Sequence, residues 1–156
     1  MDTTWTWIAV GGGHLAIGHR PKVKALAALA ADGCTHVFTL LSEREGALAL
    51  RQAVEAAGLV SLWLPLASGD PAEADERTVR AALKEARQAL MAGGRVFVHC
   101  SAGIHRTGMI ALALLRSLDI EEEDASELLV ELRAVTAEGV GSARRAWADR
   151  FGSLTG

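Results

Sequence analysis

The chain has 156 residues, of which 50% are hydrophobic and 22% are charged, and its formal net charge is −3. This length and balance are typical of a single globular domain over 1–156, and they exclude a disordered or fibrous protein. The mildly acidic balance argues against nucleic acid or an anionic membrane as the main partner, although it is compatible with a local basic pocket.

The sequence carries no sign of export or of membrane insertion. Met1 to Trp5 lack the basic start of a secretory signal, and no apolar stretch follows them. The longest stretch without a charged residue or a histidine, 56–69, is too short to span a membrane and contains a glycine and a proline. Two cysteines, Cys34 and Cys100, do not form a disulfide framework. We therefore expect a reduced, cytoplasmic protein that acts as a monomer.

The predicted elements begin with a hairpin and continue as alternating helices and strands. Trp5 to Val10 alternates apolar with small or polar residues, and a glycine turn separates it from a second short strand at 14–17. Hydrophobic spacing and turn residues then predict strands at 36–41, 59–64 and 95–99, and helices at 21–32, 42–57, 79–90, 107–118, 121–137 and 142–151.

Strands that alternate with helices predict an α/β fold with a mainly parallel central sheet flanked by helices, preceded by the N-terminal hairpin. In such sheets the ligand site lies outside the carboxyl ends of the strands. The loop that follows His99 is at one of these ends. This loop is therefore the first candidate for the functional site.

Cys100 and Arg106 stand at the two ends of this loop, and a helix follows. A cysteine is a nucleophile only as the thiolate. Three features favour negative charge on this sulfur: the N-terminus of the following helix, the converging N–H groups of the loop, and the fixed charge of Arg106. The same features bind a phosphate dianion. The loop therefore predicts thiolate attack by Cys100 on a bound phosphate.

The other residues of the loop have supporting roles in this hypothesis. Arg106 offers a planar fork for two phosphate oxygens, and Gly103 allows a backbone conformation that side chains resist. Thr107 is expected to donate its hydroxyl hydrogen to the sulfur, and His99 is expected to orient the nucleophile. His105 is expected to point outward and to tune substrate choice. The predicted phosphate-binding residues are Ser101, Ala102, Gly103, Ile104, His105 and Arg106.

The block from His99 to Gly108, HCSAGIHRTG, resembles the phosphate-binding loop of the protein tyrosine phosphatase superfamily, whose pattern is H-C-x-x-G-x-x-R-[S/T]. The order of the predicted elements is similar to the compact dual-specificity branch. The resemblance implies a cysteine-phosphatase-like fold and a two-step reaction, in which Cys100 forms a phosphocysteine that water then hydrolyses. It implies neither a metal nor a cofactor.

The resemblance also implies a general acid, an aspartate on a loop upstream of the nucleophile. The loop at 65–75 lies in the right place, and we favour Asp70, which follows Gly69. Asp75 is the alternative, and a loop without an acid is the third. Asp70 also fits as a helix N-cap, because Pro71 follows it, and Asp75 is the alternative cap, because Glu76-Arg77-Thr78 follows it.

The leading hypothesis is a cysteine-dependent phosphatase for phosphate monoesters, with phosphotyrosine, phosphoserine and phosphothreonine of proteins as substrates. A non-protein substrate, such as a nucleotide, an RNA 5′-phosphate or an inositol phosphate, is an alternative. A non-catalytic phosphate-binding module, sulfur transfer and arsenate reduction are also open. Cys34 fits a core position, although relatives with a second protective cysteine leave a pair with Cys100 open. We expect exposed, solvated side chains for Arg133, Arg144 and Arg145, and a position at the mouth of the pocket is the alternative for them.

Overall fold

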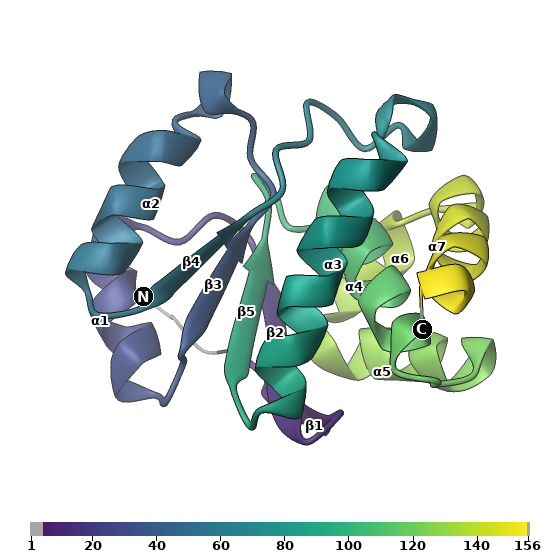
Figure 1. Cartoon of the computed structure of the whole chain (residues 1–156), viewed down its shortest axis with the longest axis horizontal. Coiled ribbons are helices and arrows are strands. Elements are labelled where there is room, and N and C mark those ends of the chain that lie inside the picture. The colour runs from purple at the N-terminus through teal and green to yellow at the C-terminus, as the bar shows by residue number, and fades with distance from the viewer. Residues whose placement is uncertain (1–4, 156) are drawn as a thin grey trace.

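The computed structural model describes the backbone of residues 5–155 and the side chains up to Gly152. The ends of the predicted domain, residues 1–4 and 156, lie outside this range. Residues 1–4 include most of the segment Met1 to Trp5, for which no secretory signal is predicted. A five-stranded sheet with the order β1-β2-β5-β3-β4 forms the centre (Figure 1). Its strands are β1 (Ile8–Val10), β2 (Gly13–Gly18), β3 (His36–Thr39), β4 (Val60–Trp63) and β5 (Arg95–His99).

The strand pairing agrees with the predicted α/β architecture. β1 is antiparallel to β2, and the pairs β2–β5, β5–β3 and β3–β4 are parallel. The mainly parallel sheet with an N-terminal hairpin is therefore confirmed. The helices are α1 (Val23–Ala31), α2 (Ala47–Ala56), α3 (Glu76–Met91), α4 (His105–Ser117), α5 (Glu122–Leu132), α6 (Ala134–Gly139) and α7 (Ser142–Thr155), with two short 3₁₀ helices, η1 (Glu43–Glu45) and η2 (Pro71–Glu73).

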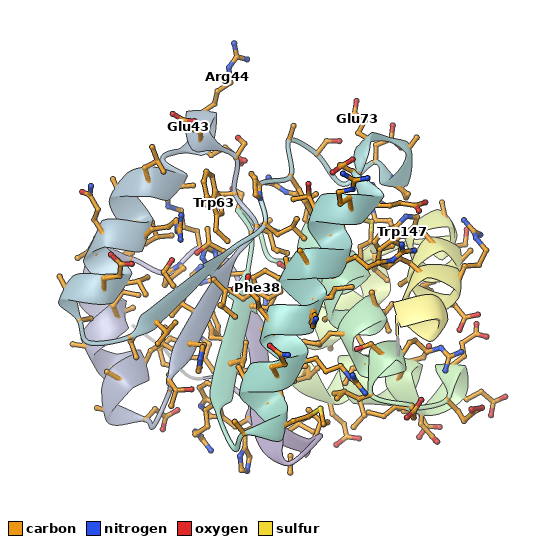
Figure 2. All side chains as sticks on the ribbon, viewed as in Figure 1. Phe38, Glu43, Arg44, Trp63, Glu73 and Trp147 are labelled. Atoms are coloured by element: carbon orange, nitrogen blue, oxygen red, sulfur yellow. The ribbon has the colours of Figure 1, made fainter. Side chains whose placement is uncertain are left out.

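Two hydrophobic cores lie on opposite faces of the sheet, because successive side chains of a strand point to opposite sides. Phe38 and Val98 pack with residues of α3 and α4, while Val37 and Phe97 pack with α1 and α2. Figure 2 shows Phe38 between the sheet and α3. Helix α4 is buried almost all round, as its apolar sequence predicts. Its N-terminus is thereby held rigidly at the carboxyl edge of the sheet.

The predicted helix at 121–137 is wrong, because the chain is extended at Arg133, with φ −171° and ψ 108°. The break separates α5 from α6. It has a tertiary cause, since the extended backbone places the Arg133 guanidinium on the carbonyls of Ala102 and Gly103. No glycine or proline marks this position in the sequence.

The predicted helix at 42–57 is also interrupted. Ser42 and Glu45 form a capping box, but it closes only the single turn of η1. Gly46 then adopts a left-handed conformation with φ 89°, and α2 begins after it. This arrangement places Glu45 on a short turn above the sheet. Figure 2 shows its neighbours Glu43 and Arg44 pointing away from the protein.

The sheet register separates the two cysteines. β3 pairs with β5 so that Thr39 lies beside His99, and Cys34 therefore lies six positions before the level of Cys100. At the rise of a β-strand this corresponds to about 20 Å. Both thiols are free, and they lie too far apart for a disulfide between them. Cys34 is a core residue, as expected, and burial raises the pKa of its thiol to about 11.

Candidate active site

Cys100 follows β5 at the carboxyl edge of the sheet and is only 3% exposed. The backbone N–H of Gly103 donates a hydrogen bond to its Sγ at 3.2 Å. Helix α4 begins at His105, so its first N–H groups have no carbonyl partner within the helix. The sulfur therefore lies where a negative charge is favoured by both the loop and the helix terminus. We call the segment from Cys100 to Arg106 the Cys100 loop.

Gly103 shapes this loop for two separate reasons. Its φ is +74°, a conformation that residues with a side chain rarely adopt. A Cβ at this position would also lie 2.3 Å from the carbonyl oxygen of Gly18 and 2.6 Å from the nitrogen of His19. The loop is thus packed directly on the end of β2, and the N–H of Arg20 donates to the carbonyl of Ser101 at 2.9 Å.

Arg106 is held by two acceptors on other loops. Its Nη1 donates to Glu45 Oε1 and to the carbonyl of Leu66, both at 2.7 Å. Its Nη2 donates to Glu45 Oε2 at 3.0 Å. A guanidinium has five N–H groups, so Nε–H and the second N–H of Nη2 are not used by Glu45 or Leu66, and these two point in the same direction. This edge is a second fork, suited to two oxygens of a phosphoryl group.

Glu45 was not among the candidate residues from the sequence. In the structure its side chain has two roles, accepting from the N–H of Ser42 at 2.9 Å and from Arg106. The hydrogen bond from Arg106 lowers the pKa of the Glu45 carboxyl to about 2, so it is ionised at every working pH. The same ion pair raises the pKa of Arg106.

His99 is completely buried and bridges two strands. Its Nδ1 lies 3.1 Å from the carbonyl oxygen of Cys100, and its Nε2 lies 2.9 Å from Thr39 Oγ1. A carbonyl only accepts, so Nδ1 carries the proton and the Thr39 hydroxyl donates to Nε2. Burial lowers the pKa of His99 to about 4, and the ring is therefore neutral near neutral pH. This geometry favours an orienting role for His99 over proton transfer.

The remaining predicted residues of the loop differ in exposure. Thr107 is fully buried, and its hydroxyl has no hydrogen-bond partner among the residues that the structure describes, so donation to the sulfur stays a prediction. His105 is exposed, and it lies beside Gly69, where a Cβ would approach the His105 Cβ to 2.8 Å. Ser101 and Ala102 are also exposed, while Ile104 is half-buried.

The loop at 65–75 accepts hydrogen bonds at two carbonyls, one from Arg106 of the Cys100 loop and one from Arg144 of α7. Leu66 accepts from Arg106, and Gly69 accepts from Arg144 Nε at 2.6 Å. Asp70 follows Gly69 and is exposed. Its side chain caps η2 by accepting a hydrogen bond from the N–H of Ala72 at 3.0 Å. The predicted cap at Asp70 is therefore confirmed, and the alternative, Asp75, is a cap as well, because it caps α3. The expectation of a solvated Arg144 is wrong, since the carbonyl of Gly69 draws its side chain onto the loop.

Asp75 differs from Asp70 in its hydrogen bonds. Its carboxylate accepts from both the N–H and the hydroxyl of Thr78. These bonds lower the pKa of Asp75, and they hold it in the ionised form. A general acid must carry a proton at the working pH, so these contacts disfavour Asp75 in that role.

Arg133 supports the Cys100 loop from the other side. Its Nη1 donates to the carbonyls of Ala102 at 3.1 Å and Gly103 at 2.9 Å, and the Thr136 hydroxyl also donates to Gly103. The expectation of an exposed, solvated Arg133 is therefore wrong, because these carbonyls bind its head group. Arg145 is likewise half-buried, with Nη2 donating to the carbonyl of Ala137 at 2.7 Å.

Within residues 5–155, no three His, Cys, Asp or Glu side chains are grouped so that they could hold a metal ion. Over the same range, no helix combines the length and the apolar character needed to cross a membrane.

A family model described as Tc-R-P, polymorphic toxin system, DSP-PTPase phosphatase, matches residues 12–118, which is more than half of the chain. The chain belongs to this family. The match includes both β5 and the whole Cys100 loop. The protein is therefore a phosphatase of the tyrosine and dual-specificity class, as the HCSAGIHRTG block predicts.

Curated relatives match the phosphatase over a shorter stretch. Human dual specificity protein phosphatase 1 is 47% identical over 45 residues, which are 28% of this chain and 12% of that protein. The chain thus matches only a small part of this relative. Two solved structures share the fold at low sequence identity. Kinase associated phosphatase, with its catalytic-site cysteine replaced by serine, has a TM-score of 0.83 and 18% identity, and the match covers 99% of this chain and 97% of that one.

PTPMT1, solved in complex with PI(5)P, has a TM-score of 0.74 and 18% identity, and the match covers 90% of this chain and 92% of that one. At such identities the two solved structures show that the fold is shared. They agree with the predicted cysteine-phosphatase-like architecture, which is confirmed.

Proposed function

We propose that this phosphatase hydrolyses phosphate monoesters through a phosphocysteine formed on Cys100. The observation that carries the proposal is the position of the Cys100 sulfur at the N-terminus of α4, with Gly103 N–H directed at it at 3.2 Å. Arg106 adds the guanidinium edge that carries Nε to the same loop. A thiolate and a phosphate-binding loop at one point provide the two requirements of nucleophilic catalysis at phosphorus.

In the first step the Cys100 thiolate attacks phosphorus, the S–P bond forms, and the bond from phosphorus to the ester oxygen breaks. The second fork of Arg106 and the N–H groups of the loop stabilise the charge on the equatorial oxygens. In the second step water attacks phosphorus, the S–P bond breaks, and inorganic phosphate and the thiolate are released. The ion pair with Glu45 keeps Arg106 in one orientation through both steps.

Asp70 is our candidate for the general acid. It would give its proton to the leaving ester oxygen in the first step and take a proton from water in the second. Its place after Gly69, which Arg144 holds beside His105, supports this assignment. The competing residue, Asp75, is held ionised by Thr78. We further propose that Thr107 stabilises the departing thiolate in the second step through its buried hydroxyl.

For substrates we propose phosphotyrosine, phosphoserine and phosphothreonine in proteins. The exposed Ser101, Ala102 and His105 leave the loop open at its surface, which suits side chains of different length. The likeness to a dual specificity protein phosphatase supports this class. A non-protein substrate is the second candidate, because the similar fold of PTPMT1 was solved with PI(5)P. We propose that one domain, 1–156, performs this reaction as a monomer in a reducing, cytoplasmic environment.

The test compares the hydrolysis of an aryl phosphate by the wild-type protein, Cys100→Ser and Asp70→Asn over a range of pH. We expect Cys100→Ser to lose at least about a thousandfold in kcat, as nucleophile variants typically do. A pure, reduced wild-type protein without turnover would contradict the proposal in favour of a phosphate-binding module. Comparing kcat/KM for phosphotyrosine, phosphoserine and phosphothreonine peptides, a nucleotide and an inositol phosphate then identifies the substrate class.

A further inference from the structure

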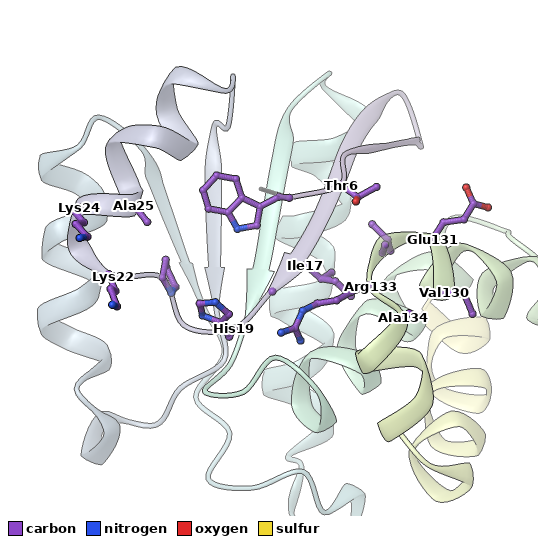
Figure 3. A pocket seen from close by; sticks show the side chains of 14 residues that line it. Thr6, Ile17, His19, Lys22, Lys24, Ala25, Val130, Glu131, Arg133 and Ala134 are labelled. Carbon is purple, nitrogen blue, oxygen red and sulfur yellow. The ribbon is translucent and has the colours of Figure 1, made fainter. Parts of the chain in front are cut away.

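A cavity of about 650 Å³ lies beside the Cys100 loop. The end of β2, the start of α1, the end of α5 and the segment at Trp5 surround it (Figure 3). Cys100 is not among the residues that line it. A cavity of this size accommodates a small organic ligand. It is therefore a separate candidate site.

The lining of this cavity is cationic, although the whole chain has a net charge of −3. Lys22 and Lys24 line it at the start of α1, and His19 and Arg133 line it near the carboxyl edge. Among its described lining residues, Glu131 is the one acid. Like charges around one cavity repel one another, and a bound anion removes that cost.

Arg133 is shared between the cavity and the Cys100 loop. All the hydrogen bonds that the Arg133 side chain makes with described residues come from Nη1. The acceptors are the carbonyls of Ala102 and Gly103 and Thr136 Oγ1. The N–H groups of Nε and Nη2 are left for another acceptor. Figure 3 shows the guanidinium extending into the cavity toward His19. An anion in the cavity would therefore meet a donor that is already fixed in place.

The rest of the wall is apolar. Trp5 is half-buried, with its ring packed edge-on against Phe97 at 5.8 Å, and it lines the cavity together with Ile17. Val130 also lines the cavity and is 54% exposed, which is high for a valine on a helix. An aromatic or aliphatic ligand body would cover these residues and bury apolar surface.

We propose that this cavity binds a small organic anion, with its apolar body against Trp5 and Val130 and its phosphate or carboxylate group between Lys22 and Arg133. The site is distinct from the position of the nucleophile, because Cys100 does not line it. It adds a ligand-binding function to the chain next to the loop that carries the chemistry.

The test measures binding of anilinonaphthalene sulfonate, a fluorescent aromatic anion that a phosphatase cannot hydrolyse. Saturating vanadate is present, so that an oxyanion already occupies the Cys100 loop. We expect one probe per chain. The double charge reversal Lys22→Glu with Lys24→Glu should weaken binding by about tenfold or more, as loss of charge-assisted contacts does. The matched control, Arg77→Glu with Lys84→Glu on α3, should bind as the wild type does.

A second variant tests the cavity without changing its charge. Ala134 is exposed and lines the cavity, so Ala134→Trp should fill it and abolish binding without lowering the melting temperature. The uncharged analogue phenylnaphthylamine should bind more weakly than the sulfonate. Displacement of the probe by vanadate, equal binding to the reversed variant, or equal binding of the uncharged analogue would each overturn the proposal. Activity is not measured here, so loss of the proposed reaction would leave this result unaffected.

Discussion

Glu45 and Arg106 form a two-pronged ion pair between residues 61 positions apart in the chain, with Glu45 Oε1 2.7 Å from Arg106 Nη1. The Glu45 carboxylate binds Nη1 and Nη2 at the end of the guanidinium, so the edge that carries Nε faces away from Glu45. Because Glu45 is also fixed by the capping box at Ser42, the plane of the guanidinium has one orientation. In the proposed reaction, Glu45 is therefore a positioning residue for Arg106.

Replacing Glu45 with alanine should lower kcat/KM for an aryl phosphate by about 10- to 100-fold, because a misplaced group in an active site typically costs that much. Exposed Glu43, which points away from the protein in Figure 2, supplies the matched control. Glu43→Ala should retain wild-type kinetics. Steady-state kinetics of both variants are the measurement. Full activity of Glu45→Ala would show that the ion pair does not position Arg106 for the reaction.

Burial of His99 predicts a pH-dependent stability. Its pKa falls from 6.5 to about 4 on folding, so the unfolded chain binds the proton more readily and stability falls as the pH drops through this window. Between about pH 7.5 and about pH 5 the loss due to His99 is about 2 kcal/mol. Denaturant unfolding at both pH values should show it in the wild type.

The variant His99→Asn should lose less stability than the wild type over the same pH interval. His105→Asn, at an exposed histidine, is the control and should keep the wild-type difference. If His99→Asn and the wild type lose the same free energy of unfolding, the buried ring of His99 is not the source of the pH dependence.

The contact between Arg144 and Gly69 predicts an effect that depends on the leaving group. Arg144→Met removes the donor that holds the loop next to Asp70, and Asp70→Asn removes the acid itself. General acids contribute typically about 10²- to 10⁴-fold, and most for poor leaving groups. Both variants should therefore lose far more activity on phosphoserine peptides than on an aryl phosphate. Asp75→Asn should lose equally little on both, and the reverse pattern would make Asp75 the acid.

The two thiols should differ in alkylation. Burial raises the pKa of Cys34 to about 11, so it has little thiolate near neutral pH. Cys100 lies at the N-terminus of α4, in the loop that is proposed to bind phosphate. Peptide mapping after brief iodoacetamide treatment should find the label on Cys100, and vanadate should protect it. Preferential labelling of Cys34 would contradict the assignment of Cys100 as the nucleophile.

The features that local sequence encodes were predictable, and the features that rest on distant contacts were not. The Cys100 loop is specified within thirteen residues, 96–108. These residues contain a buried strand, a glycine with positive φ and the start of an apolar helix. By contrast, Glu45–Arg106, Thr39–His99 and Gly69–Arg144 are separated by 61, 60 and 75 residues. Hydrophobic periodicity does not report such pairs, and the break at Arg133 has the same tertiary origin.

The central claim is that Cys100 itself carries the phosphoryl group during turnover. The direct measurement is mass spectrometry of the Cys100 peptide after the protein reacts with an aryl phosphate and is quenched within one turnover. We expect one phosphoryl group on Cys100 in the wild type, more of it in Asp70→Asn, whose second step lacks the base, and none in Cys100→Ala. Turnover without any phosphorylated Cys100 under these conditions would contradict a phosphocysteine intermediate.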